Sequence, residues 1–328
     1  MPPITDYDII QGKRTYQYYE GEVLYPFGHG LTYSRIEYST LAVQQKENTH
    51  LSVSLYVSNV GKAVTDEVVQ VYYHKPGSAV KRPKKTLVAF ERIKALQPGE
   101  KREVLFHIPL AELKYFDVIS EEMLLEPGEY LIQAGTSSEQ ILLKERITLQ
   151  GTERGKRNGF LMNKAENFDF ARNYVLHGSH LGYTAVCSRN GTDIVELSYE
   201  KMYLEEAANQ IKLDFWLEYC CRICIRIDGE VVGEYQTGNI LGSGELSGGF
   251  QTGNILEDKE KHTQLQAGQA NGAGALKAQE DWLVRRRRIG FTEICVSIKN
   301  VPVQKEFALS IQWQGMGKLC FYQFCPLR

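Results

Sequence analysis

Paired carboxylates are the first residues in this chain whose types could support chemistry. General acid–base catalysis by two carboxyl groups requires that both groups face one reacting bond. Asp66-Glu67 and Glu121-Glu122 are adjacent in sequence, and neighbours along a strand point to opposite sides. Because neither pair can flank a single bond, we interpret both as solvated surface charges.

The cysteines could bind a metal ion or form disulfides. Cys221 and Cys224 have the spacing of half a zinc knuckle, but an alternating strand pattern points them to opposite faces, and no second pair completes a tetrahedral site. An odd number of cysteines without a recognisable export signal favours reduced thiols in a cytoplasm. We expect buried structural thiols, with no metal or other cofactor, at Cys187, Cys220, Cys221, Cys224, Cys295, Cys320 and Cys325.

Two basic runs could contact anions. Lys81-Arg-Pro-Lys-Lys85 is predicted to be a solvated turn, with a contact to another domain or to an anionic ligand as the alternative. Arg285-Arg-Arg-Arg288 could bind phosphates, but no interleaved aromatic residues or nucleic-acid-binding motif accompany it. The net charge of −2 gives no global attraction to nucleic acid or to an anionic membrane. We therefore expect neither among the partners.

An aromatic segment at 14–33 is the most distinctive stretch of the chain. It surrounds a Pro-Phe-Gly-His-Gly turn in which Gly28 and Gly30 permit positive φ angles. Such a segment is predicted to be an extended strap that needs large surfaces on both sides, and few apolar residues precede it. The strap therefore resembles one half of a joint whose other half is missing. Its aromatic residues are Tyr16, Tyr18, Tyr19, Tyr25, Phe27 and Tyr33.

Length and composition allow two domains of ordinary size. The chain has 328 residues, 43% of them hydrophobic, which is enough to bury a core in each domain. No apolar stretch approaches the roughly 20 residues that a membrane-spanning helix needs.

Period-2 patterning predicts a β-sandwich for residues 34–150. In the segment 50–59, Leu51, Val53, Leu55 and Val57 share one face, which is typical of a half-buried strand. Ala111–Phe116 is predicted to be a brief helical turn. Several short strands at this spacing, without long helices between them, indicate a sandwich; they are predicted at 67–74, 86–93, 102–108, 129–135 and 141–149.

The polar segment 151–160 is predicted to be a linker. A second strand series follows in residues 161–328, with alternating patterns at 211–217, 221–227, 294–298 and 307–313. The chain is thus predicted to be all-β, with two sandwich domains. Within the second, Gln236–Leu241 recurs unchanged as Gln251–Leu256, and the composition of 236–288 predicts a long mobile insertion.

A family resemblance covers residues 1 to about 150. It rests on Asp6-Tyr-Asp8, Arg14-Thr-Tyr16, Leu24-Tyr-Pro-Phe-Gly-His-Gly-Leu-Thr-Tyr33, Asp66-Glu-Val-Val-Gln-Val-Tyr72, Arg82-Pro83, Phe90-Glu-Arg92, Leu96-Gln-Pro-Gly99 and Glu126-Pro-Gly-Glu-Tyr130. These motifs resemble the segment of glycoside hydrolase family 3 that leaves the catalytic body and enters a fibronectin type III-like domain. The resemblance implies a strap at 1–33 that contacts a partner domain through Tyr16, Tyr18, Tyr25, Phe27 and Tyr33.

A second resemblance covers residues 161–328. It rests on Lys164-Ala-Glu-Asn-Phe168, Leu181-Gly-Tyr183, Asn190-Gly-Thr-Asp-Ile-Val-Glu196, Ile225-Arg-Ile-Asp-Gly229 and Gly317-Lys-Leu-Cys-Phe-Tyr322. These motifs are similar to a carbohydrate-binding module of family 6, a jelly-roll sandwich.

The second resemblance implies a sugar site in which Tyr183 and Phe291 are the stacking pair. Flat rings suit the apolar C–H face of a pyranose. Lys318 stands where the family usually has a sugar-bonding asparagine, and Cys320 stands where it has an aspartate that often helps to hold calcium. We expect no calcium here, because Lys164 also replaces an acidic residue ahead of Glu166.

Together the resemblances imply a non-catalytic C-terminal accessory region of a β-glucosidase or β-xylosidase. No catalytic nucleophile or acid/base is expected on this chain, because neither domain resembles the catalytic barrel. The implied partners are family 3 catalytic domains and β-linked glycans. The alternative is a stand-alone glycan-binding or self-associating protein, in which a second copy of the chain covers the strap.

Overall fold

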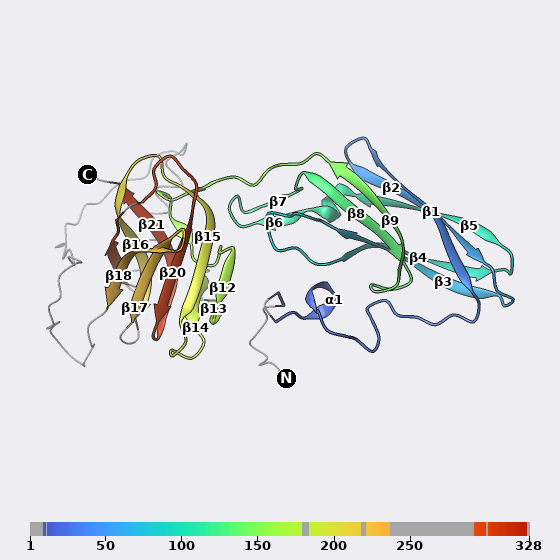
Figure 1. Ribbon diagram of the computed structural model, residues 1–328, viewed down its shortest axis with the longest axis horizontal. Coiled ribbons are helices and arrows are strands. Elements are labelled where there is room, and N and C mark those ends of the chain that lie inside the picture. The colour runs from blue at the N-terminus through green and yellow to red at the C-terminus, as the bar shows by residue number, and fades with distance from the viewer. Residues whose placement is uncertain are drawn as a thin grey trace, which may run out of the picture. The chain divides into compact units, whose positions relative to one another are not determined.

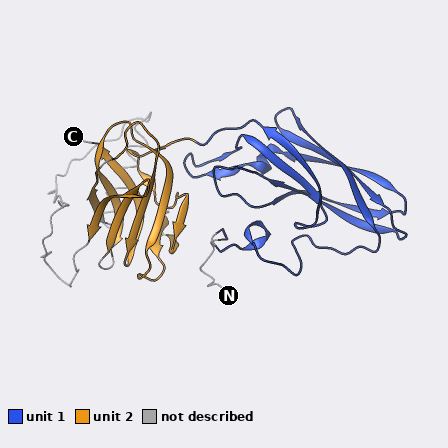
Figure 2. Cartoon of the chain, in the orientation of Figure 1, with its two compact units in different colours: residues 1–154 blue, residues 155–328 orange. Residues whose placement is uncertain are grey.

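The computed structural model describes residues 9–10, 12–178, 184–217, 221–236, 292–299 and 301–326. The chain forms two compact units, Met1–Arg154 and Gly155–Arg328 (Figure 2). Tyr183, Phe291, Arg285–Arg288 and nearly all of the predicted insertion 236–288 lie outside the described residues. No helix among the described residues is long and apolar enough to cross a membrane.

The first unit consists of strands, with short helical turns in its N-terminal part and after β5 (Figure 1). The elements are α1 (Thr15–Tyr18), β1 (Ile36–Lys46), β2 (His50–Asn59), β3 (Thr65–His74), β4 (Thr86–Leu96), β5 (Lys101–Pro109), the 3-10 helix η1 (Leu110–Leu113), β6 (Tyr115–Asp117), β7 (Glu122–Leu124), β8 (Gly128–Gly135) and β9 (Ile141–Leu149).

Two antiparallel sheets of the first unit enclose one core. One sheet has the order β1-β2-β5 and the other the order β4-β3-β8-β9. Leu51, Val53, Leu55 and Val57 of β2 are fully buried, as the period-2 pattern predicts, and they pack in one cluster with residues of β3 and β8. This confirms the predicted sandwich.

The predicted helical turn at 111–116 is right only in its first half. Leu110–Leu113 forms the 3-10 helix η1, with both of its leucines buried. Tyr115–Asp117 is instead strand β6, which pairs with β7. The sequence contains no proline or glycine that would separate the turn from so short a strand.

The segment after β9 is fixed to the first unit. Thr152 N donates to Leu125 O over 2.8 Å, and Arg154 Nε lies 2.7 Å from Asp117 Oδ1. The side chains of Arg154 and Asp117 are 3% and 0% exposed. The predicted linker therefore begins as an ordered part of the first sandwich.

The second unit, within the described residues, is built of strands (Figure 1). The elements are β10 (Arg157–Asn158), β11 (Asn163–Lys164), β12 (Phe170–Arg172), β13 (Tyr174–Gly178), β14 (Thr184–Ser188), β15 (Val195–Tyr203), β16 (Ala208–Leu217), β17 (Arg222–Ile227), β18 (Glu230–Gln236), β19 (Thr292–Ser297), β20 (Phe307–Gln314) and β21 (Gly317–Pro326).

The strand order of the second unit is that of a jelly roll. One sheet has the order β10-β15-β20-β17-β18 and the other the order β13-β14-β21-β16-β19. From β14 to β17 and from β18 to β21, successive strands alternate between the sheets, which is the crossing pattern of a double-sheet Greek-key sandwich. Leu197, Ile225, Ile311, Leu213 and Phe324 are fully buried between the sheets, so the predicted all-β fold is confirmed for this unit too.

The prediction of buried thiols is right for some of the cysteines and wrong for others. Cys187, Cys221 and Cys320 are buried. The remaining described cysteines, Cys224, Cys295 and Cys325, are only half-buried, because strand alternation places them on the outer faces of the sheets.

Candidate functional site

The strap rests on the outer side of its own sandwich. The ring of Tyr16, in α1, stacks on Phe27 with ring centroids 4.3 Å apart and an interplanar angle of 12°. It also meets the ring of Tyr72 edge-on at 6.3 Å. The Tyr16 hydroxyl accepts a hydrogen bond from Leu87 N over 3.1 Å. Tyr16 thus joins the strap to both β3 and β4.

Backbone hydrogen bonds fix the strap further. Lys84 N donates to Gln17 O over 2.9 Å, and Ser138 N donates to Phe27 O over 2.8 Å. The Lys84 ammonium adds a hydrogen bond to Tyr19 O over 2.6 Å. Part of the basic run 81–85 therefore binds the chain's own backbone instead of an external anion.

The buried side chain of Gln70 holds the Pro-Phe-Gly-His-Gly turn in place through hydrogen bonds. Its amide nitrogen donates to Gly28 O over 3.0 Å and to Thr136 O over 2.6 Å, while its carbonyl oxygen accepts from the Tyr72 hydroxyl over 2.6 Å. Gly28 has a φ of +81° and lies directly on this amide. Gly30 shows no positive φ, so only Gly28 uses the conformational freedom that we predicted for both glycines.

The strap follows β3 toward its first residue. The hydroxyls of Thr32 and Thr65 are 2.8 Å apart, and Ser34 Oγ donates to Asn59 Oδ1 over 2.6 Å. Asn59 is itself fully buried and donates to Leu96 O. The chain's own sheet thus supplies one of the two surfaces that the strap needs.

Four apolar side chains of the fixed strap point into solvent. Leu24, Tyr25, Leu31 and Tyr33, which we call the strap patch, are 94%, 75%, 92% and 95% exposed. Phe90, the cross-strand neighbour of Gln70, is also exposed.

The five residues predicted to contact a partner domain have different surroundings in the structure. Tyr16 and Phe27 anchor the strap, although Phe27 keeps 46% of its surface exposed. Tyr25 and Tyr33 belong to the strap patch, and Tyr18 is half-buried in α1.

The adjacent carboxylates of β3 point to opposite sides, as the strand geometry predicts. Asp66 lies at the surface and pairs with Arg92 over 2.6 Å. Glu67 is buried and accepts a hydrogen bond from the Tyr38 hydroxyl over 2.8 Å, so the prediction of a solvated surface charge is wrong for this residue. Burial raises the pKa of Glu67, although the Tyr38 hydrogen bond favours its charged form.

Glu67→Gln should leave the free energy of unfolding at pH 7 unchanged or raise it by up to about 1 kcal/mol. The raised pKa means that wild-type stability falls as the pH rises from the ordinary pKa of a glutamate, near 4.3, through the folded value. A glutamine keeps an acceptor for Tyr38 without a buried charge. Urea unfolding at pH 4 and pH 7 measures the difference, and a loss of more than about 1 kcal/mol at pH 7 would contradict this interpretation.

Of the residues predicted for the sugar site, only Lys318 lies within the described residues. Lys318 is the second residue of β21, and its ammonium lies 5.1 Å from the ring centroid of Trp216 on β16. These two residues are register partners. Sequence reasoning missed Trp216, although strand alternation around the buried Phe215 would have placed it on the outer face.

Cys320 lies where the family resemblance has a calcium-binding aspartate. It packs in a small buried cluster with Ala185, Cys187 and Phe321. Among the residues that the structure describes, no group of three or more His, Cys, Asp or Glu side chains is arranged to hold a metal ion.

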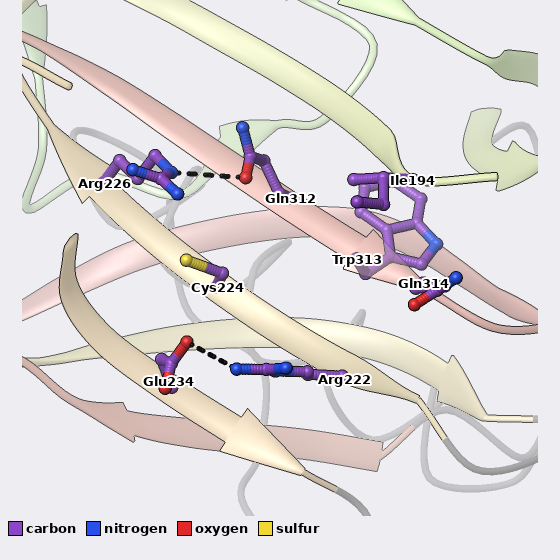
Figure 3. A pocket seen from close by; sticks show the side chains of 8 residues that line it. All are labelled: Ile194, Arg222, Cys224, Arg226, Glu234, Gln312, Trp313 and Gln314. Carbon is purple, nitrogen blue, oxygen red and sulfur yellow. Dashed lines mark hydrogen bonds and ion pairs between the residues drawn. The ribbon is translucent and has the colours of Figure 1, made fainter. Parts of the chain in front are cut away.

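A shallow pocket of about 180 Å³ lies on the outer face of the sheet that contains β17, β18 and β20 (Figure 3). Arg226 Nε donates to Gln312 Oε1 over 3.3 Å, and Gln312 Nε2 donates to Glu196 Oε1 over 2.9 Å. Burial raises the pKa of the Cys224 thiol. The lining residues are Ile194, Arg222, Cys224, Arg226, Glu234, Gln312, Trp313 and Gln314.

Comparison with known proteins agrees with the fold of the first unit. Residues 67–138 match the family described as "Fibronectin type III-like domain". The Thermostable beta-glucosidase B of Acetivibrio thermocellus is 38% identical over 156 residues, which are 46% of this chain and 20% of the relative. The Beta-glucosidase of Kluyveromyces marxianus is 38% identical over 137 residues, 41% of this chain and 16% of the relative.

Among solved structures, the GH3 beta-glucosidase of Bifidobacterium adolescentis is similar to this chain at 32% sequence identity. The alignment covers 42% of this chain and 20% of that enzyme, with a TM-score of 0.40. The chain thus spans about a fifth of the length of the relatives that it matches. The matches confirm that the first unit carries a fibronectin type III-like domain similar to the C-terminal region of family 3 β-glycosidases.

Proposed function

We propose that this chain is a non-catalytic accessory region of a β-glycosidase and that its first unit docks onto catalytic domains through the strap patch. The observation that carries this proposal is the contrast within the strap. Its backbone is held by Gln70, Lys84 and Ser138, yet Leu24, Leu31 and Tyr33 are almost wholly exposed. The similarity to β-glucosidases supports catalytic domains as the partner.

The energetics of the strap patch favour docking. Burying a large apolar side chain stabilises an interface by about 1.5–3 kcal/mol, and tyrosines are common among the residues that dominate binding energy. A strap fixed before binding also loses little conformational entropy when its partner arrives. The strap patch could therefore provide the central contacts of a stable interface.

A chimera tests the docking. The matched segment of Thermostable beta-glucosidase B is replaced by residues 1–154 of this chain, and β-glucosidase activity and thermal unfolding are measured. We expect an active chimera whose Tm falls by several degrees on Leu31→Ser with Tyr33→Ser, because the buried contacts with the catalytic part are lost.

Leu105→Ser is the matched control, because Leu105 is half-exposed on β5, in the other sheet of the unit. Equal Tm values for the double variant and for this control would count against the strap patch as the docking surface.

For the second unit we propose binding of a β-linked oligosaccharide or polysaccharide. The jelly-roll fold and the half-buried Trp216–Lys318 pair on the outer face of its sheet support this function, and Tyr183 and Phe291 remain the predicted stacking residues. Isothermal titration with xylan, cellulose and β-glucan oligosaccharides should give heat that Tyr183→Ala, Phe291→Ala or Trp216→Ala abolishes.

In the same titration, Gln312→Ala distinguishes a glycan site beside Trp216 from a glycan site on the outer face of the other sheet. Loss of sugar binding in this variant alone would move the glycan site to the pocket of Figure 3. Absence of heat with every sugar would contradict the glycan proposal and leave the docking proposal untouched.

The second candidate function is self-association through the strap patch. It is favoured by the same exposed side chains, which a second copy could cover. Light scattering of the purified chain measures its molar mass and so distinguishes self-association from docking onto catalytic domains. A dimer that dissociates in the Leu31→Ser, Tyr33→Ser variant would support self-association.

A further inference from the structure

Two histidines face one another on the outer side of the first sandwich, away from the strap. His50 begins β2, and His107 lies near the end of the neighbouring strand β5. The register pairs His50 with Pro109 and Ser52 with His107, so the two histidines are diagonal neighbours. Their ring centroids are 5.5 Å apart with an interplanar angle of 64°.

This separation suits two imidazoles that share one metal ion. A metal–nitrogen bond of about 2.1 Å puts the ion roughly 3.2 Å from the centre of each ring. Ring centroids 5.5 Å apart then correspond to a nitrogen–metal–nitrogen angle of about 120°, close to tetrahedral geometry.

A neighbouring hydroxyl orients one of the rings. Thr49 Oγ1 lies 2.9 Å from His50 Nδ1 and donates its own proton to Lys46 O over 3.4 Å. In the Nδ1–H tautomer of His50, the hydroxyl oxygen accepts from Nδ1–H, and the lone pair of Nε2 is left for a ligand. Such a hydrogen bond to the non-ligating nitrogen commonly fixes the orientation of a metal-bound histidine.

The surroundings leave the pair open to solvent. His107 is exposed and His50 is half-buried. Lys46 is the register partner of His50 on β1, and it is exposed, so its charge is hydrated. Water would complete the coordination of an ion held by the two histidines.

We propose that His50 and His107 bind one divalent transition-metal ion. Two imidazole nitrogens at an angle close to tetrahedral suit Zn²⁺, and imidazole also binds Ni²⁺ and Cu²⁺, whereas Ca²⁺ and Mg²⁺ need oxygen ligands. Because β5 is the last strand in the order β1-β2-β5, the ion would tie this strand to β2.

The test is isothermal titration of the metal-free full chain with NiCl2, which does not oxidise the cysteines. His50→Ala and His107→Ala should each weaken Ni²⁺ binding by more than about tenfold, and Thr49→Val should weaken it less. His177→Ala is the matched control, since His177 is an exposed histidine on strand β13 of the other unit, and it should bind as wild type does.

Unchanged Ni²⁺ affinity in the His50→Ala, His107→Ala double variant would overturn the proposal, because the ion would then be bound elsewhere on the chain. Absence of any Ni²⁺ binding to the wild-type chain would overturn it as well. Circular dichroism of each variant checks that the sandwich is intact, which we expect because both side chains lie on its outer face.

Discussion

Replacing Asp117 by asparagine should lower the free energy of unfolding of the first unit by about 3 kcal/mol. Asp117 is fully buried and lies 2.7 Å from Arg154, which is 3% exposed. Its second oxygen accepts hydrogen bonds from Ser120 N and Ser120 Oγ over 2.9 and 3.0 Å. The variant removes the negative charge that lies 2.7 Å from the buried guanidinium, and removing one partner of a buried ion pair is strongly destabilising.

The Asp117–Arg154 pair should also make the stability of the first unit depend on pH. Burial opposes the charge of Asp117, but the Ser120 hydrogen bonds and Arg154 outweigh it and hold the pKa of Asp117 below its usual range. A lowered pKa contributes stability above the unfolded value, near 3.9, and this stability is lost as the pH falls through the folded value. Wild-type protein should therefore lose stability below about pH 4, whereas Asp117→Asn lacks this part of the loss.

Hydrogen exchange of β3 and β8 peptides measures the first unit alone, at pH values on both sides of the transition. Glu129→Gln is the control, because the Glu129–Arg146 pair is exposed and such pairs contribute at most about 1 kcal/mol. If Asp117→Asn changed protection no more than Glu129→Gln does, the buried pair would not be what holds the segment after β9.

Gly28→Ala should detach the strap while leaving the sandwich folded. A Cβ atom at Gly28 would lie 1.9 Å from Gln70 Oε1, and the φ of +81° is strained for alanine. Gln70 has little freedom to move away, because it is buried and hydrogen-bonded to Gly28 O, Thr136 O and the Tyr72 hydroxyl. We expect the local opening free energy to fall by about 2 kcal/mol.

The amides of Ser138 and Lys84 report this opening, because they donate to Phe27 O and Gln17 O of the strap. Their hydrogen exchange should become roughly 30-fold faster in Gly28→Ala. Gly30→Ala is the matched control, since a Cβ there meets nothing within 4 Å. Equal protection from hydrogen exchange in the two variants would show that the hydrogen bonds of Gln70 do not hold the strap.

The fold could be predicted from the local sequence pattern, whereas the side-chain contacts between residues distant in sequence could not. Alternation of Leu51, Val53, Leu55 and Val57 is visible in the sequence and places β2 correctly. The Asp117–Arg154 pair joins residues 37 positions apart, and no local rule signals such a partner. The same holds for the diagonal of His50 and His107, which depends on strand register.

The candidate site was predicted only in part. Aromatic composition singled out the strap, but its division into anchors and exposed residues depends on Gln70 and Tyr72. Both belong to the motif at 66–72 that carries the family resemblance, but nothing in that motif indicated a contact with the strap. Trp216 could have been found from its place beside Phe215 in an alternating strand. Tyr183 and Phe291 lie outside the described residues, and their role in sugar binding stays a prediction, as does a cytoplasmic location.

Photo-crosslinking from the strap patch tests the docking claim most directly. A benzoylphenylalanine in place of Tyr33, which is 95% exposed, is introduced into the β-glucosidase chimera and irradiated, with the same substitution at Leu105 as control. The proposal predicts crosslinks from position 33 to the catalytic part of the same chain and none from position 105. Crosslinks only within the grafted unit, only to a second copy, or equally from both positions would contradict it.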